Sequence, residues 1–255
     1  MPRYDFRTPR LFVAHPLTPA AHLALDRAQT NYLVNVLRLK AGDPVLVFNG
    51  RDGEWRAHLA IGPRKQGALV IAEQTRPQPP PGDLHYLFAP LKHARLDYMV
   101  QKAVEMGATR LQPVRTRHTQ AVRVNLERMQ ANAVEAAEQC GILAVPEIGE
   151  PLALEQAVAA LEPSRLLVFC DEDAEVKDPV AALAAMQRSA GPMPLAVLIG
   201  PEGGFAEEER AQLTRRPRVV RLSLGPRILR ADTAAVAALA LVGAVLGDCP
   251  GSHNP

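Results

Sequence analysis

The feature that most constrains the fold is a proline run near the end of the first third of the chain. Residues 76–83 read Arg-Pro-Gln-Pro-Pro-Pro-Gly-Asp, with four prolines in five positions. Proline fixes φ and lacks an amide donor, so neither a helix nor a central strand continues through such a run. We therefore predict an extended linker at 76–83 that separates a domain of residues 1–75 from a domain of residues 84–255.

The residues before the linker carry the patterns of short strands. An apolar run at 45–48 precedes an Asn-Gly-Arg-Asp-Gly turn, and apolar residues alternate with polar ones over 55–61. Alternation of this kind is typical of a strand with one buried face. Further short apolar runs lie at 11–13 and 68–71, and a helical stretch lies near 31–37. We expect a small, mostly β domain in the form of a barrel.

After the linker, apolar runs of strand length alternate with helical patterns. The predicted strands lie at 84–91, 166–169, 195–199 and 219–224, and the predicted helices at 96–106, 125–140 and 231–247. This alternation is typical of an α/β domain with a largely parallel sheet covered by helices.

Composition and the cysteines exclude several classes of protein. Of 255 residues, 47% are hydrophobic, which excludes a disordered or collagen-like chain. The longest uncharged apolar run, at 233–247, is shorter than the ~20 residues that a membrane helix needs. Cys140, Cys170 and Cys249 lie too far apart for a disulfide framework, and no cysteine or histidine pair has the spacing of a metal site. No apolar targeting segment follows the first arginines, so we expect a cytoplasmic protein without a bound metal.

The charge is segregated along the chain although the net charge is only +2. Residues 1–76 hold eleven basic and six acidic residues, and residues 92–123 hold seven basic and two acidic residues. Residues 124–188 reverse this balance, with four basic and twelve acidic residues. Two basic stretches beside the linker suit a surface that faces a polyanion, although solvated surface is the commoner role of such stretches.

The glycine-rich segment 199–205 follows a predicted buried strand and precedes a helix. It reads Ile-Gly-Pro-Glu-Gly-Gly-Phe, which matches neither the dinucleotide fingerprint nor the P-loop. Ligands of open α/β sheets bind at such strand ends. Glu202 and the acidic residues at 207–209 argue against a phosphate at the helix start, so a neutral or cationic ligand fits better. A plain tight turn is the alternative interpretation.

The segment 222–233 places two arginines between a predicted strand and the last helix. Arg227 and Arg230 are three residues apart, so they share a face if the segment is helical, and they suit an anionic or carbonyl-rich substrate. Asp232 or Thr233 is positioned to cap the final helix. A structural role for the arginines is the alternative.

Taken together, the motifs resemble those of the RsmE-type uridine N3-methyltransferases of small-subunit (16S) ribosomal RNA, in the SPOUT superfamily. The resemblance covers nearly the whole chain, at residues 10–13, 32–38, 42–43, 92, 95–97, 101–107, 137–139, 199–204 and 224–230. Two positions depart from the family pattern: Ile142 stands in place of an arginine, and Asp232 in place of a glutamate.

This resemblance implies a fold, a cofactor and an assembly. The fold would be an N-terminal PUA-like β-barrel that docks RNA and a C-terminal α/β domain with a trefoil knot, which general folding rules would not predict. The protein would be a homodimer that uses S-adenosylmethionine as the methyl donor. The implied cofactor-binding residues are Ile199, Gly200, Pro201, Glu202, Gly203, Gly204, Leu222, Ser223, Leu224, Gly225, Ile228 and Leu229.

The resemblance also implies roles for charged residues. Methylation of uracil N3 requires loss of the imide proton, and an arginine stabilises the resulting anion. We expect Arg230 and Arg227 to do so, and Asp232 to accept the proton or to fix an arginine. The expected RNA contacts are Arg10, Arg38, Lys92, Arg95, Arg115 and Arg117. Two other functions stay open: a noncatalytic RNA-binding or ribosome-assembly factor of the same fold, and an enzyme that binds nucleotide phosphates.

Overall fold

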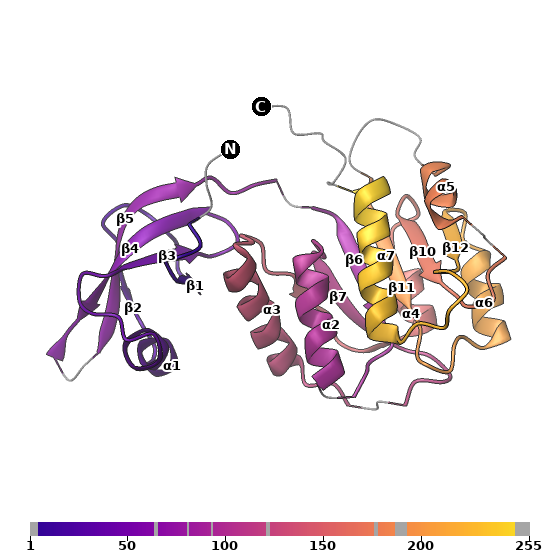
Figure 1. Cartoon of the computed structure of the whole chain (residues 1–255), viewed down its shortest axis with the longest axis horizontal. Coiled ribbons are helices and arrows are strands. Elements are labelled where there is room, and N and C mark those ends of the chain that lie inside the picture. Colours follow the sequence, from indigo (N-terminus) through magenta and orange to yellow (C-terminus); the bar gives the residue numbers. More distant parts are fainter. Residues whose placement is uncertain are drawn as a thin grey trace. The chain divides into compact units, whose positions relative to one another are not determined.

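The chain forms two compact units (Figure 1). The structure is a computed structural model, and it describes residues 5–63, 66–80, 82–92, 94–120, 123–175, 178–186 and 193–247. Unit 1 comprises the residues up to 81 together with residues 137–145, and unit 2 comprises residues 82–136 and those from 146 onward. The chain therefore passes from unit 1 to unit 2 at the end of the proline run. No linker or change in composition in the sequence indicates that residues 137–145 belong to unit 1.

Unit 1 is built on a curled five-stranded sheet. Its strands, in the order β1-β3-β4-β5-β2, are β1 (Arg10–Phe12), β3 (Pro44–Phe48), β4 (Glu54–Ile61), β5 (Gly67–Arg76) and β2 (His22–Ala24). β1 runs parallel to β3 and the other pairs are antiparallel. Alternate residues of β4 and β5, such as Ala57, Leu59 and Leu69, are buried, as the period of two requires. Among the described residues β1 and β2 do not pair, so the expected barrel is a curled open sheet.

The helical stretch of unit 1 begins earlier than the sequence indicates. Asp26 caps α1 (Arg27–Thr30), because its carboxylate accepts the amide of Gln29 at 2.7 Å. A π-helical turn, η1 (Asn31–Val36), continues it, with Leu37 N–H donating to the carbonyl of Tyr32 at 2.9 Å.

A buried carboxylate joins three parts of unit 1. Glu54, at the start of β4, accepts hydrogen bonds from Arg10 at 2.9 Å and from Arg76 at 2.8 Å. Arg76 also donates to the carbonyl of Gly141 at 2.9 Å, and the amide of Phe12 donates to the carboxylate of Glu138 at 2.8 Å. These bonds account for the inclusion of residues 137–145 in unit 1.

Unit 2 is an α/β unit whose sheet is entirely parallel. The strand order is β12-β10-β11-β6-β7-β8, and β9 pairs with β7. The strands are β6 (Leu84–Phe88), β7 (Arg110–Arg115), β8 (Glu147–Ile148), β9 (Leu152–Ala153), β10 (Leu166–Cys170), β11 (Leu195–Ile199) and β12 (Val219–Leu222). The central strands β10 and β11 are continuous apolar runs because helices cover both faces of the sheet. The α/β prediction for this part of the chain is confirmed.

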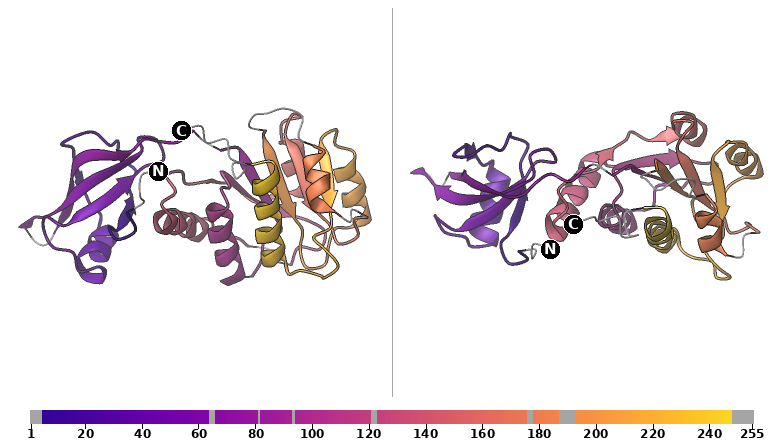
Figure 2. Two further views of the ribbon diagram at one scale, coloured as in Figure 1. Left: turned by 45° about the horizontal axis from the view of Figure 1, so that its top comes forward. Right: turned by 90° about the horizontal axis from the view of Figure 1, so that it is seen from above.

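Helices cover the two faces of this sheet, as Figure 2 shows from two further directions. α2 (Ala94–Glu105) packs beside α7 (Ala231–Val245), which also contacts α5 (Pro179–Ala184). The other face carries α4 (Leu154–Ala159) and α6 (Glu207–Thr214), which contact each other. α3 (Leu126–Cys140) leads from unit 2 into unit 1. In the described residues no helix has both the length and the apolar character to cross a membrane. The threading of the last segment through a knot stays a prediction.

Candidate active site

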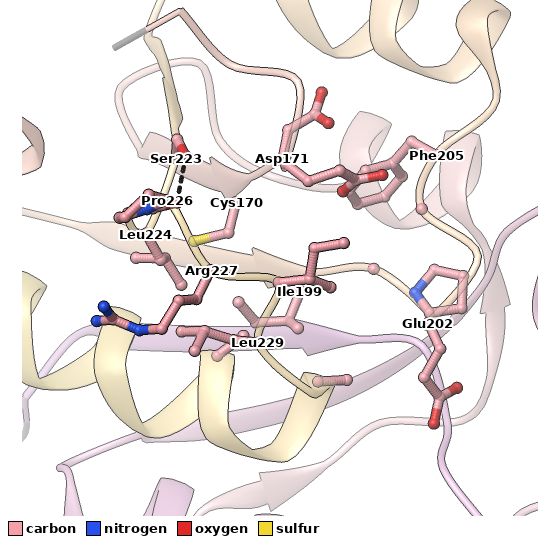
Figure 3. Close-up of a pocket in the computed structure, with 18 residues that line it drawn as sticks. Cys170, Asp171, Ile199, Glu202, Phe205, Ser223, Leu224, Pro226, Arg227 and Leu229 are labelled. Atoms are coloured by element: carbon pink, nitrogen blue, oxygen red, sulfur yellow. Dashed lines mark hydrogen bonds between the residues drawn. The ribbon is translucent and has the colours of Figure 1, made fainter. Parts of the chain in front are cut away.

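A cavity of about 230 Å³ opens at the carboxyl ends of β10, β11 and β12, three adjacent strands of unit 2 (Figure 3). Its wall is formed by residues of three segments: 170–172 at the end of β10, 199–205 at the end of β11, and 223–234, which leads into α7. Strand-to-helix loops meet at this edge of a parallel sheet, and that is where α/β proteins bind ligands. The two motifs singled out in the sequence are therefore opposite walls of one cavity.

The first wall is shaped by glycine and by one buried ring. Phe205 is 3% exposed and stands edge-on to Phe169 of β10, with the ring centroids 5.9 Å apart. A side chain at Gly200 would place its Cβ 2.9 Å from the Phe205 ring, so the backbone turns around this ring only with glycine at position 200. Gly204 has a φ of +68°, and its Cβ would collide with the carboxylate of Glu172.

The start of the helix that follows this loop is acidic and does not favour a phosphate. Glu209, in the first turn of α6, accepts the amide of Ala206 at 2.9 Å with one oxygen and the amide of Arg117 at 2.8 Å with the other. Glu207 and Glu208 lie in the same turn. Since a carboxylate already occupies the helix start, the phosphate-binding alternative lacks the bare N-terminus that it requires.

The second wall is an irregular segment rather than a helix. Gly225 has a φ of +106°, the hydroxyl of Ser223 donates to its carbonyl at 3.4 Å, and regular structure resumes only at the start of α7. Arg227 and Arg230 therefore do not share a helical face, because the helical backbone on which that interpretation depends is absent from this segment. The Gly225-Pro226 pair explains the difference, because proline cannot continue a helix and the glycine is left-handed. Apolar side chains, including those of Leu224 and Leu229, line this wall.

The start of α7 also differs from the expectation. Its N-cap residue is Arg230, in an extended conformation and without a side-chain cap. Asp232 lies inside the first turn, where its carboxylate accepts the amide of Thr233 at 2.9 Å. Arg230 and Asp232 are beside the cavity in sequence but outside its wall, whereas Arg227 lines it.

The third segment of the wall carried no recognisable motif. Cys170, Asp171 and Glu172 line the cavity at the end of β10. Burial and the neighbouring Asp171 raise the pKa of the Cys170 thiol to about 12, so it is no nucleophile. The carboxylate of Asp171 is completely buried and accepts hydrogen bonds from two arginines, Arg210 and Arg221. The apolar run before Cys170 predicts a strand but not that its end reaches a ligand site.

Comparisons with known proteins decide the family. A family model described as an RNA methyltransferase domain matches residues 78–243, and one described as an RNA methyltransferase PUA domain matches residues 25–71. A ribosomal RNA small subunit methyltransferase E from Synechocystis sp. is 33% identical, with 93% of this chain and 78% of the relative covered. The chain belongs to the ribosomal RNA small subunit methyltransferase E family.

Further members of this family share its length and its fold. The Rickettsia conorii enzyme is 29% identical over 89% of this chain and 91% of its own. The Neisseria gonorrhoeae enzyme, solved with S-adenosylmethionine, superposes with a TM-score of 0.81 at 25% identity, covering 93% of this chain and 97% of that one. A Legionella pneumophila protein solved with the same cofactor gives 0.80 at 29% identity, with 93% and 98% covered. These findings confirm the predicted family and fold class: the chain is a ribosomal RNA methyltransferase, and the two solved relatives hold the expected cofactor, S-adenosylmethionine.

Most cofactor-binding residues predicted from the family resemblance lie at the cavity. Two do not line it: Leu222 is completely buried in β12, and Gly203 faces His118, whose Nδ1 lies 3.0 Å from the Gly203 carbonyl. The cavity is lined further by Phe205, Pro226, Ala231 and Ala234. Phe205 reaches the cavity wall because the backbone turns around its ring at Gly200. The sequence does not indicate this turn.

Basic residues expected to bind RNA in this family member divide into two groups. Within unit 2, Arg95 pairs with Glu202 at 3.1 Å and Arg117 with Glu208 at 3.5 Å, beside the first wall of the cavity. Lys92 and Arg115 are exposed. All four guanidinium or ammonium groups reach solvent, as a phosphate-binding role requires.

Within unit 1 the two expected arginines differ sharply. Arg38 is exposed and has a φ of +58°, an uncommon conformation for a residue other than glycine. The side chain of Arg10 is only 5% exposed and is paired with Glu54. Arg10 is therefore structural and does not fit the expected RNA contact, because β1 is buried against β3 and turns this side chain inward.

Proposed function

We propose that this family member transfers a methyl group from S-adenosylmethionine to N3 of a uridine in 16S ribosomal RNA, in the cytoplasm and as a homodimer. The observation that carries the proposal is the cavity at the ends of β10, β11 and β12, which two glycine-shaped loops enclose and which Arg227 flanks. When bound, S-adenosylmethionine supplies a methyl group on a positively charged sulfur.

The lining suits this cofactor in two respects. Ile199, Leu224 and Leu229 offer apolar surface to a purine ring, and the glycine turns at 200 and 225 bring backbone donors and acceptors close to the ligand. Carboxylates at Asp171, Glu172 and Glu202 favour a cation over a phosphate. The proposed cofactor-binding residues are the predicted ones that line the cavity: 199–202, Gly204, 223–225, Ile228 and Leu229.

The arginines beside the cavity supply the chemistry that uracil needs. N3 must lose its proton, and the charge spreads over the two flanking carbonyl oxygens, which a guanidinium stabilises. We assign this role to Arg230, with Arg227 orienting the base. Both residues are exposed; Arg227 lines the cavity, and Arg230 follows three residues later. Asp232, in the first turn of α7, accepts the proton or fixes an arginine.

RNA binding falls to basic residues of both units. Lys92, Arg95, Arg115 and Arg117 supply phosphate contacts in unit 2, and Arg38 supplies one in unit 1. The uridine must be unpaired or extruded, because a base pair covers N3.

Exposed apolar residues before and along α7 support the proposed homodimer. Ile228 is 91% exposed, and Ala240 and Ala244 are exposed on α7, which carries no charged residue after Asp232. A dimer that buried these side chains would remove their apolar area from water. Sedimentation equilibrium should therefore give a dimer, and Ile228→Asp should shift it toward the monomer.

The experiment that tests the function uses small ribosomal subunits from a strain that lacks this protein. Incubation with labelled S-adenosylmethionine should place one methyl group on N3 of a single uridine, located by mass mapping of 16S ribosomal RNA. Arg230→Ala should abolish methyl transfer while the protein still binds the donor. The control is Arg215→Ala, which changes an exposed arginine in the turn after α6. Donor binding without any methyl transfer by the wild type would favour the noncatalytic assembly factor.

A further inference from the structure

One buried carboxylate joins the two walls of the cavity. Asp171 follows β10 directly, its side chain has no exposed area, and its amide donates to the carbonyl of Leu222 at the end of β12 at 2.9 Å. Its Oδ2 accepts hydrogen bonds from Arg210 at 3.0 Å and from Arg221 at 2.8 Å. The two arginines are 39 and 50 residues away in sequence, so only the fold brings them together.

Each arginine belongs to an element that leads into, or out of, one wall. Arg210 lies on α6, which begins three residues after Gly204, and Arg221 lies on β12, two residues before Ser223. Arg210 also pairs with Glu172 at 3.4 Å, and Glu172 is the side chain against which Gly204 packs. The first wall is thus held from α6 and the second from β12, and both are held to the same carboxylate.

Asp171 and its two arginines depend on one another for charge compensation. A carboxylate that is buried with its hydrogen bonds satisfied is stable only while its partners stay in place. The hydrogen bond from Arg210 to Asp171 raises the pKa of that guanidinium, and Asp171 is the side chain with which Arg221 pairs among the described residues. Loss of the Asp171 charge would leave Arg221 uncompensated beside a cavity that is to hold a cation.

We propose that Asp171 is the positioning residue of the donor site: it fixes the separation of segments 199–204 and 223–229 and neutralises Arg210 and Arg221, so that a positively charged methyl donor is accepted. The inference rests on the proposed binding of S-adenosylmethionine in this cavity. The residue does not react; it acts through the two loops.

Calorimetry with the full-length protein tests the charge component. Asp171→Asn should weaken S-adenosylmethionine binding about tenfold, as expected for one unscreened charge near a sulfonium at intermediate dielectric. S-adenosylhomocysteine, which lacks the sulfonium charge, should lose clearly less affinity. Asp173→Asn is the matched control, because Asp173 also pairs with Arg210, at 2.8 Å, but is 64% exposed and makes no contact to Arg221. It should leave both affinities within about twofold, as is usual for exposed pairs.

Amide hydrogen exchange without any ligand tests the positioning component. Asp171→Asn should speed exchange in both 199–204 and 223–229, and Asp173→Asn in neither. Arg221→Gln keeps the bond between Asp171 and Arg210, so it folds even if Asp171→Asn does not, and it should loosen only 223–229. Equal losses for donor and product together with unchanged loop exchange in Asp171→Asn would overturn the inference. Failure of the wild type to bind the donor at all would overturn the proposed function and the inference with it.

Discussion

Both units contain a buried carboxylate held between two arginines, yet the two arrangements serve different ends. The side chain of Glu54 in unit 1 is 3% exposed and that of Asp171 in unit 2 is completely buried. In each case the shortest arginine contact is 2.8 Å, from Arg76 and from Arg221. Thr75 also donates to Glu54 at 2.9 Å, and Arg76 continues to the carbonyl of Gly141. The Glu54 cluster thus ties strands and the 137–145 segment, while the Asp171 cluster ties two loops that enclose a cavity.

The comparison shows that the role of a buried carboxylate depends on the segments that carry or adjoin its arginine partners. Burying a carboxylate costs free energy, which only well-placed donors offset. In unit 1 the donors continue into regular strands, so the cluster stabilises the sheet. In unit 2 the donors lie beside irregular loops, so the same device sets the shape of a binding site.

The largest expected effect comes from removing the charge in unit 1. Glu54→Gln should lower the free energy of unfolding of unit 1 by about 3 kcal/mol, because two arginines lose a buried partner. Trp55, the single tryptophan of the chain, lies next to Glu54 in β4, so its fluorescence during urea unfolding reports on this unit. The affinity for S-adenosylmethionine measured by calorimetry should stay unchanged. A weakened donor affinity with intact stability would show that the two clusters do not divide these roles.

The free energy of unfolding of unit 1 should depend on pH through the ionisation of Glu54. Burial by itself would raise the pKa of Glu54, but the hydrogen bonds from Arg76, Thr75 and Arg10 together outweigh burial and lower it below the ordinary 4.5. A lowered pKa means that the ionised group adds stability above the unfolded pKa, and that this stability is lost as the pH falls through the folded pKa. The stability difference between wild type and Glu54→Gln should therefore be full at pH 7 and shrink below pH 4.5. A difference that grows on acidification would contradict the assignment.

How far the sequence predicts this molecule depends on the range over which the signals act. Apolar runs and glycine segments are local, so the strands β10 and β11 and the loop at 199–204 are predicted from them. The role of Asp171 is not, because the three acidic residues after β10 suggest an exposed surface until the parallel register brings β12 beside β10. The prediction for Arg10 errs in the opposite way. A basic residue in a basic stretch suggests an exposed position, but Arg10 is buried where β1 aligns with Leu46 of β3.

The same limit applies to conformation at single residues. The spacing of Arg227 and Arg230 suggests a shared face only if the backbone is helical, and Gly225 removes that condition. The extent of the cavity depends on how Gly200 turns around Phe205, a contact that no periodicity encodes. Local patterns thus predict which segments form the site, whereas charge pairing across strands decides which side chains hold it together.

The smallest effect is expected where the same kind of ion pair is left in water. Arg56 and Glu73 pair at 2.9 Å across β4 and β5, the two strands that also carry Glu54 and Arg76, but their side chains are 42% and 65% exposed. Water screens such a pair and its side chains lose entropy when they are held, so Arg56→Gln should change the free energy of unfolding by less than about 0.5 kcal/mol. The same Trp55 fluorescence measurement checks this against Glu54→Gln. A comparable loss in both variants would mean that strand pairing, rather than burial of the carboxylate, makes the Glu54 cluster important.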